Sequence, residues 1–179
     1  MKKIFLFIFF LGTIVMIFVM AKTGSTLKTP AAHSGILDLE FAYNTSKTTP
    51  IIISWQQTGN IGAAKINTYW DFLFLFFYAG FLFFVCKKIA ANSKGPVAKA
   101  GNIIAKAALL AGLFDVLENA GMLLTLNNQG SSTVAFFTTF FSVIKWTLVI
   151  VTVLFALTGS LVLAYRKIKY RINFVETKK

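Results

Sequence analysis

Four ionisable side chains interrupt long apolar runs of the sequence: Asp71, Asp115, Glu118 and Lys145. At the centre of a transmembrane helix, each would cost about 2.5–3.5 kcal/mol on insertion scales unless it is paired or hydrated. Carboxylates and a lysine in such surroundings can bind a ligand or an ion, transfer protons, or tie neighbouring helices together. The residue types leave these three interpretations open.

The spacing of the acidic residues predicts a common helical face. Asp115, Glu118 and Asn119 are three or four residues apart and would lie close together on one side of a helix. If that helix enters the membrane at Lys106, Asp115 lies about 14 Å and Glu118 about 18 Å from the inner boundary. The carboxylates are therefore expected well inside the membrane.

The other candidates are expected nearer the outer boundary. Asp71 lies at the outer start of its apolar run, and Tyr78 follows about two turns later on the same face. Lys145 precedes Arg166, the inner end of its run, by about 31 Å of helix. These depths predict an outward-facing polar cavity with Asp115 as its inner floor. Its predicted members are Asp71, Tyr78, Asp115, Glu118, Asn119 and Lys145.

Several kinds of chemistry are excluded or unsupported. The single cysteine, Cys86, cannot form an internal disulfide, and the single histidine, His33, cannot form a histidine metal cluster. The sequence has no nucleophile elbow, phosphate-binding loop, zinc-protease motif or dinucleotide fingerprint. We therefore predict no metal and no cofactor, and an enzyme is the less favoured reading. Acid/base catalysis on a lipid needs only such carboxylates and remains open.

The composition is that of a membrane protein. Of 179 residues, 56% are hydrophobic and only 13% are charged, whereas about a quarter of an ordinary soluble domain is charged. The apolar runs predict an all-α, polytopic protein in which four transmembrane helices form a bundle. The expected spans are 4–21, 69–86, 103–126 and 140–165, within a single membrane domain covering 1–179.

The first and fourth apolar runs differ in length from a typical signal peptide and from a single perpendicular span, respectively. The first run could be a cleaved signal peptide, but it exceeds the usual apolar region of about 7–15 residues, so an uncleaved span is favoured. The fourth apolar stretch, 134–165, is about 48 Å long as a helix. It must therefore tilt, protrude or begin as an interfacial helix.

The loop 22–68 is expected outside the cytoplasm, with short interfacial helices rather than a separate domain. One helix is expected at 35–41, and another is expected to start with Thr49 as its N-cap and Pro50 at its first position. The nearby Trp55 suits the headgroup layer, where amphipathic aromatic residues are enriched.

The charge distribution predicts the orientation. The net charge is +12, but the cations gather beside the apolar runs, which indicates cytoplasmic loops rather than nucleic-acid binding. We therefore expect the cytoplasmic parts to be segments 87–102 and 166–179 and both termini. The membrane itself is expected to be a bacterial inner membrane. The flanking cations are Lys2, Lys3, Lys87, Lys88, Lys94, Lys99, Lys106, Arg166, Lys167, Lys169, Arg171, Lys178 and Lys179.

The order of several short motifs resembles a family of small four-span bacterial membrane proteins. The motifs are Gly35-Ile36-Leu37-Asp38-Leu39-Glu40-Phe41-Ala42, Trp55, Asp71-Phe72-x-Phe74 with Tyr78, Gly112-Leu113-Phe114-Asp115-Val116-Leu117-Glu118-Asn119, and Lys145. The resemblance covers most of residues 35–160. It adds Glu40 and Trp55 to the candidate site residues, and it implies no activity.

Three functions follow in order of preference. The first is a non-catalytic ligand-binding or accessory protein, whose partner is a membrane lipid, a lipid-like ligand or a membrane protein. The second is an intramembrane acid/base enzyme acting on a lipid. The third is a small transporter, which would need a homo-oligomer because four helices leave little room for a pore.

Overall fold

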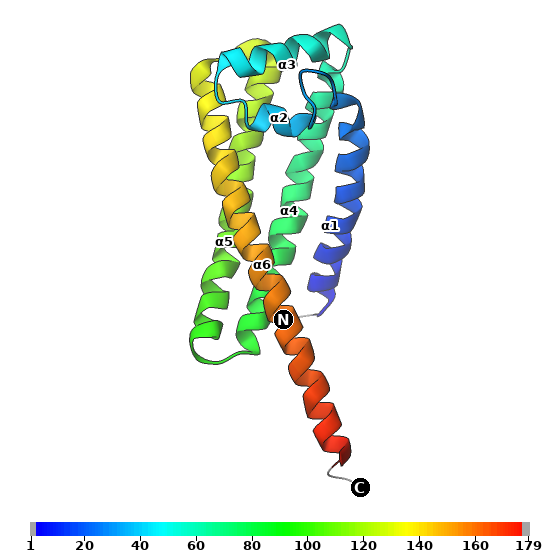
Figure 1. Cartoon of the computed structure of the whole chain (residues 1–179), viewed down its shortest axis with the longest axis vertical. Helices are drawn as coiled ribbons and strands as arrows, with labels where there is room; N and C mark the ends of the chain where they lie inside the picture. Colours follow the sequence, from blue (N-terminus) through cyan, green and yellow to red (C-terminus); the bar gives the residue numbers. More distant parts are fainter. Residues whose placement is uncertain (1–2, 177–179) are drawn as a thin grey trace.

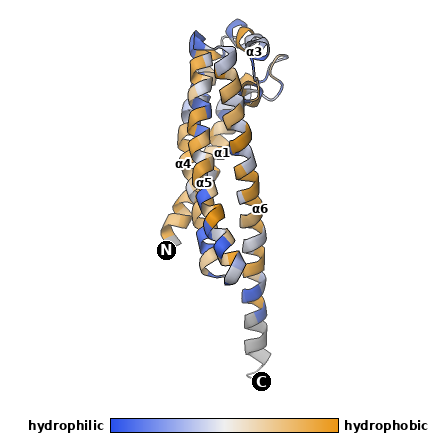
Figure 2. Cartoon of the chain, turned by 90° about the vertical axis from the view of Figure 1, so that its left-hand side faces the viewer, coloured by the Kyte–Doolittle hydropathy of each residue, from blue (hydrophilic) through white to orange (hydrophobic). Residues whose placement is uncertain are grey.

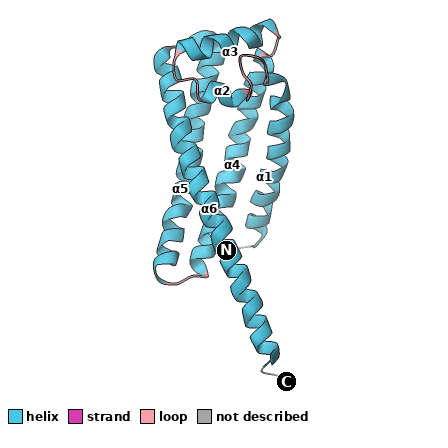
Figure 3. Cartoon of the chain, in the orientation of Figure 1, coloured by secondary structure: helices cyan, strands magenta, loops and turns pink. Residues whose placement is uncertain are grey.

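The computed structural model describes residues 3–176, which are almost entirely helical and contain no strand (Figure 3). Three cations used to predict the orientation, Lys2, Lys178 and Lys179, lie outside these residues. The elements in chain order are α1 (Lys3–Gly24), the short turn η1 (Ser25–Leu27), α2 (Ile36–Glu40), α3 (Thr45–Gln57), α4 (Ile61–Ala91), α5 (Gly95–Leu124), the wide turn η2 (Thr125–Gln129) and α6 (Ser132–Glu176).

Four helical segments among the described residues are long and apolar enough to cross a membrane. They are Ile4–Leu27, Ile61–Ala91, Gly95–Gln129 and Ser132–Lys169. Hydrophobic residues dominate along these helices in Figure 2. Each expected span falls within one of the segments, and the helices extend beyond the apolar runs at their ends. The protein is thus all-helical, with four potential membrane spans.

Helix α4 is the centre of the packing (Figure 1). It packs along α5 and α1 and also contacts α6, while α5 packs along α6. Small residues allow α4 and α5 to approach closely: a Cβ atom on Gly112 would lie 3.1 Å from Ala79 Cβ, and one on Gly101 would lie 3.0 Å from Ala90 Cβ. This close approach brings the polar residues of α4 and α5 face to face.

Helix α1 is attached mainly to α4, through aromatic rings. The Phe9 ring centroid lies 5.2 Å from that of Phe76, and the Phe10 centroid lies 5.4 Å from that of Phe81. Helices α1 and α6 are not one of the extensively packed pairs. Both helices flank α4, so the molecule has a groove between α1 and α6.

Helices α2 and α3 close one end of the molecule, with α3 lying across the ends of the long helices (Figure 1). A buried apolar layer beneath them includes Leu27, Leu39, Ile51, Trp55 and Met122. Helix α2 corresponds to the helix expected at 35–41.

The predicted start of α3 at Thr49 and Pro50 is wrong. The helix begins at Thr45, because the Asn44 side chain accepts a hydrogen bond from Lys47 N at 3.1 Å and caps it. Pro50 lies inside the helix.

Candidate functional site

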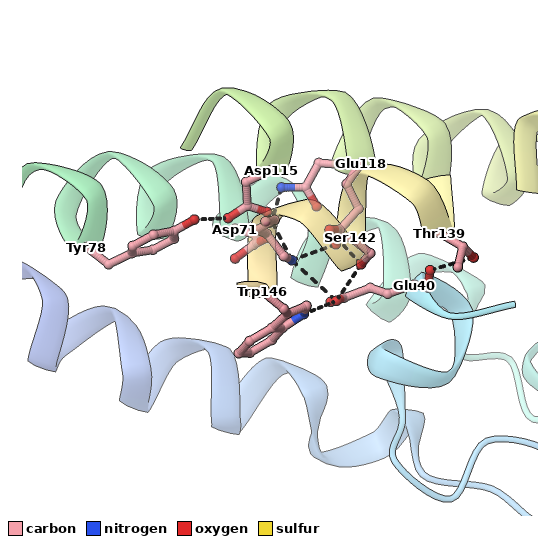
Figure 4. Close-up of polar contacts among 10 residues, drawn as sticks. Glu40, Asp71, Tyr78, Asp115, Glu118, Thr139, Ser142 and Trp146 are labelled. Atoms are coloured by element: carbon pink, nitrogen blue, oxygen red, sulfur yellow. Dashed lines mark hydrogen bonds and ion pairs between the residues drawn. The ribbon is translucent and has the colours of Figure 1, made fainter. Parts of the chain in front are cut away.

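Lys145 of α6 belongs to a buried polar network, of which Glu40, Asp115 and Glu118 are labelled in Figure 4. Its Nζ lies 2.8 Å from Glu118 Oε1, 3.3 Å from Asp115 Oδ1 and 3.3 Å from Glu40 Oε2. An ammonium group has three N–H donors. All three are therefore used by carboxylates from α5 and α2.

Two hydrogen bonds connect α4 to this network. Tyr78 donates its hydroxyl to Asp115 Oδ2 at 2.7 Å, so both Asp115 oxygens are engaged. Asn119 Nδ2 donates to Asp71 Oδ2 at 2.9 Å. The three or four residues between Asp115, Glu118 and Asn119 place all of these side chains on the buried face of α5.

Glu40 reaches the network from α2, far away in the sequence. Its Oε2 accepts hydrogen bonds from Trp146 Nε1 at 3.1 Å and Lys145 Nζ at 3.3 Å. Its backbone oxygen accepts one from Thr139 Oγ1 at 3.0 Å. Both the side chain and the backbone of Glu40 are thus bound to α6, which fixes the end of α2 above the site.

The structure brings together seven of the eight predicted site residues. Glu40, Asp71, Tyr78, Asp115, Glu118, Asn119 and Lys145 are all buried and form the contacts described above. Trp55 is separate: it lies in the apolar layer below α3 and donates Nε1 to Leu27 O at 2.8 Å. The sequence predicts Trp55 in the headgroup layer, but its side chain is fully buried inside the protein. Asp71 forms no ion pair with Lys145 within the described part of the chain.

Three further residues complete the site. Ser142 donates to Glu118 Oε2 at 2.7 Å, Trp146 donates to Glu40, and Asn67 lies one turn before Asp71 on α4. Asn67 lies four residues before Asp71, and Ser142 lies three residues before Lys145. Helical spacing therefore places each of them beside a charged site residue, which is a signal that could have identified both. Nothing in the local sequence distinguishes Trp146.

A cavity of about 650 Å³ begins at this network and continues along the groove between α1 and α6. Side chains of Glu40, Asn67, Asp71, Tyr78, Asp115 and Lys145 line its polar part. Its apolar part includes Phe74, Phe81, Leu82, Val149 and Val153, further from α2 along α4 and α6. Glu118 and Asn119 are buried behind these residues and do not line the cavity.

Some acceptor atoms at the cavity remain free. Asn67 Oδ1 is buried and has no hydrogen-bond partner among the described residues. In the same part of the chain, Asp71 Oδ1 and Glu40 Oε1 accept no hydrogen bond, although the second oxygen of each carboxyl group does. Asn67, Asp71 and Glu40 all line the cavity, so these oxygens can accept hydrogen bonds from a molecule bound in it.

Carboxyl groups outnumber the cation at this site. Glu40, Asp115 and Glu118 contact Lys145, and Asp71 is hydrogen-bonded to Asn119 nearby. Full ionisation of these four carboxyl groups would leave three negative charges that Lys145 does not compensate (four minus one). No group of acidic, histidine or cysteine side chains among the described residues is arranged to hold a metal ion.

Comparison of the chain with protein-family models, with curated proteins and with solved structures finds no match.

Proposed function

We propose that this chain is an integral membrane protein that binds an amphipathic, lipid-like molecule without chemically changing it. The observation that carries the proposal is the cavity, which joins a buried charged network to an apolar groove. Its volume of about 650 Å³ lies within the range of about 300–1,000 Å³ typical of ligand sites. A polar headgroup would occupy the network and an apolar chain the groove.

In this proposal the four long helices form a transmembrane bundle, and α1 is retained as its first span. Helices α2 and α3 lie at the outer headgroup layer, so the site is in the outer half of the membrane. The clusters of cations at Lys87, Lys88, Arg166 and Lys167 favour a cytoplasmic position for the opposite end and for both termini. The resemblance to bacterial four-span proteins favours the bacterial inner membrane.

The groove supplies a route for the ligand from the bilayer. Helices α1 and α6 enclose a space, and α4 lines this space with Phe74, Phe81 and Leu82. A chain entering sideways between α1 and α6 would replace contacts with bulk lipid by contacts with these side chains. An interhelical tie alone would need the Lys145 ion pairs but no adjoining cavity.

Acid/base catalysis on a lipid is the second candidate, and Asp71 is the observation that favours it. Asp71 lines the cavity and has one free carboxyl oxygen, whereas Glu118 is bonded on both oxygens and lies behind the cavity wall. If Asp71 acts as a catalytic acid or base, the lipid retained by Asp71→Asn will differ in mass from that retained by the unaltered protein. Identical masses support binding alone.

Transport is less well supported. The deeper part of the cavity is lined by Leu82, Val149 and Val153, which offer no hydrogen bonds to a permeating ion. A continuous polar path would therefore require a second copy of the chain.

The binding proposal is tested by filling the groove. Val153 lines the cavity, while its neighbour Leu154 is 57% exposed on the outside of α6. Native mass spectrometry of protein extracted from its own membrane should show a retained lipid in the unaltered chain and in Leu154→Trp. Val153→Trp should lose most of it. Equal retention in Val153→Trp and Leu154→Trp would contradict the proposal.

A further inference from the structure

The hydrogen-bond donors at the polar part of the cavity are already used. Lys145 gives its three protons to carboxylates, Tyr78 donates to Asp115, and Trp146 donates to Glu40. The Asn67 amide nitrogen donates to Met20 O at 3.2 Å and to Thr23 Oγ1 at 2.7 Å. A ligand that needs donors, such as a phosphate or a carboxylate, would have to break these contacts.

The orientation of the Asn67 amide is fixed by its neighbours. Met20 O can only accept a hydrogen bond, and the Thr23 hydroxyl already donates to Val19 O at 2.8 Å. Both positions therefore require the amide nitrogen of Asn67. Its oxygen consequently points to neither of them and has no hydrogen-bond partner among the described residues, in a buried residue that lines the cavity.

Three oxygens of cavity-lining residues accept no hydrogen bond within residues 3–176. They are Asn67 Oδ1, Asp71 Oδ1 and Glu40 Oε1. Asn67 and Asp71 are one turn apart on the same face of α4, and Glu40 approaches from α2. Combined with the excess of carboxyl groups over Lys145, this arrangement attracts a positive charge that carries several N–H donors.

We propose that the ligand's headgroup is a primary ammonium, held by Asp71, Asn67 and Glu40, with its apolar chain in the groove between α1 and α6. This inference rests on the proposed function and adds the chemical class of the headgroup. A primary ammonium supplies three donors and one positive charge, matching the free acceptors in number and the site in sign. Lys28 and Ser34 also line the cavity, and both residues are exposed to solvent, whereas these three acceptors belong to buried residues.

The test compares headgroups on one chain. The protein is placed in phosphatidylcholine nanodiscs, whose headgroups have no N–H donor, and titrated with dodecylamine, dodecyltrimethylammonium, dodecanol or dodecyl phosphate. Bound molecules are counted by native mass spectrometry. Dodecylamine should bind at least about tenfold more tightly than each of the others, because only it offers both charge and donors. Equal or tighter binding of dodecyl phosphate would overturn the inference and favour an anion bound near Lys28.

Variants locate the ammonium. Asp71→Asn should weaken dodecylamine binding about tenfold or more and leave dodecanol binding unchanged. Asp38→Asn is the matched control, because Asp38 is a half-buried acid that does not line the cavity. Its carboxylate accepts a hydrogen bond from Ser34 N at 2.7 Å, which an asparagine oxygen can also accept. Unchanged dodecylamine binding in a folded Asp71→Asn protein would overturn the inference. The headgroup ranking uses the unaltered chain and decides the matter if Asp71→Asn does not fold.

The two proposals fail in different ways. If the four probes bind alike and Val153→Trp blocks them all, binding in the groove stands and the ammonium inference falls. If Val153→Trp blocks none of them, the groove itself is not the site. Replacing phosphatidylcholine by phosphatidylethanolamine distinguishes two sources of the amine: competition with dodecylamine identifies an aminophospholipid, and absence of competition identifies a single-chain amine.

Discussion

At the level of single residues, Lys145 connects side chains from distant parts of the sequence. Glu40 comes from α2, while Asp115 and Glu118 come from α5. Breaking a buried ion pair by removing one partner is strongly destabilising, since the other charge stays buried without compensation. Lys145 is therefore a structural centre of the site as well as part of the cavity wall.

Lys145→Met should lower the free energy of unfolding by about 3–5 kcal/mol, because it leaves three carboxyl groups without their cation. Thermal or denaturant unfolding in mild detergent, followed by circular dichroism, measures the loss. Lys106→Met is the control, since Lys106 is exposed on α5 and forms no ion pair among the described residues. Equal stability of the two variants would show that the buried pairs contribute little.

The residues of the long helices could be predicted as site members because charge in an apolar run is costly and helical spacing is regular. Asp115, Glu118 and Lys145 were identified on that basis alone. The position of Glu40 at the site depends on α2 folding back over α6, which is a long-range contact that no local sequence pattern encodes. Only the family resemblance predicts Glu40 as a site residue. Asn67 and Trp146 are uncharged, so their burial at the site carried no comparable signal.

At the level of elements, α2 depends on the loop that presents it. It has five residues, which is far too short to be stable alone. Gly35 precedes it with φ +67°, a conformation that side-chain-bearing residues rarely adopt. Hydrogen bonds from Thr139 and Trp146 then hold Glu40 at its other end.

Gly35→Ala should lower stability by about 1–3 kcal/mol through backbone strain, and it should also weaken ligand binding by displacing Glu40. Gly59→Ala is the matched control: Gly59 has φ +71°, nothing lies within 4 Å of a Cβ atom placed there, and it does not line the cavity. Unfolding and lipid retention are measured for both variants. Ligand loss of the same size in Gly59→Ala would indicate a general effect of strain.

The long helices were predictable from their apolar length, whereas the start of α3 was not. Thr49 and Pro50 form a good helix-start pattern, but Asn44 caps the helix five residues earlier and the helix continues through Pro50. The groove was also beyond prediction. It exists because α1 and α6 do not pack closely, and hydrophobic patterning does not specify which spans become neighbours.

At the level of the whole molecule, polar and charged segments lie at both ends of the long helices (Figure 2). The charged residues of the turn before α5 are all cations, whereas the turn before α6 has no charged residue. This difference underlies the proposed orientation, with the candidate site in the outer half of the bilayer.

Cysteine labelling tests the orientation. Cys86 is the only cysteine and is buried, so Cys86→Ser provides a silent background. In intact cells, a membrane-impermeant maleimide should label Gln129→Cys, which lies in the exposed turn before α6. Lys94→Cys, in the exposed turn before α5, should react only after permeabilisation. Reversed labelling would place the site in the inner half instead.

The position of Lys145 one span after Glu118 affects how the chain enters the membrane. Helix α5 carries two carboxyl groups that a lone helix would insert at a cost of about 2.5–3.5 kcal/mol each. Helix α6 follows it directly and carries the cation that both of them bind. If α5 and α6 span the membrane as proposed, they would partition most favourably as a hairpin, in which α6 leaves the translocation machinery before α5 is released into lipid. Biogenesis of this protein would then depend on the timing of synthesis of its last helix.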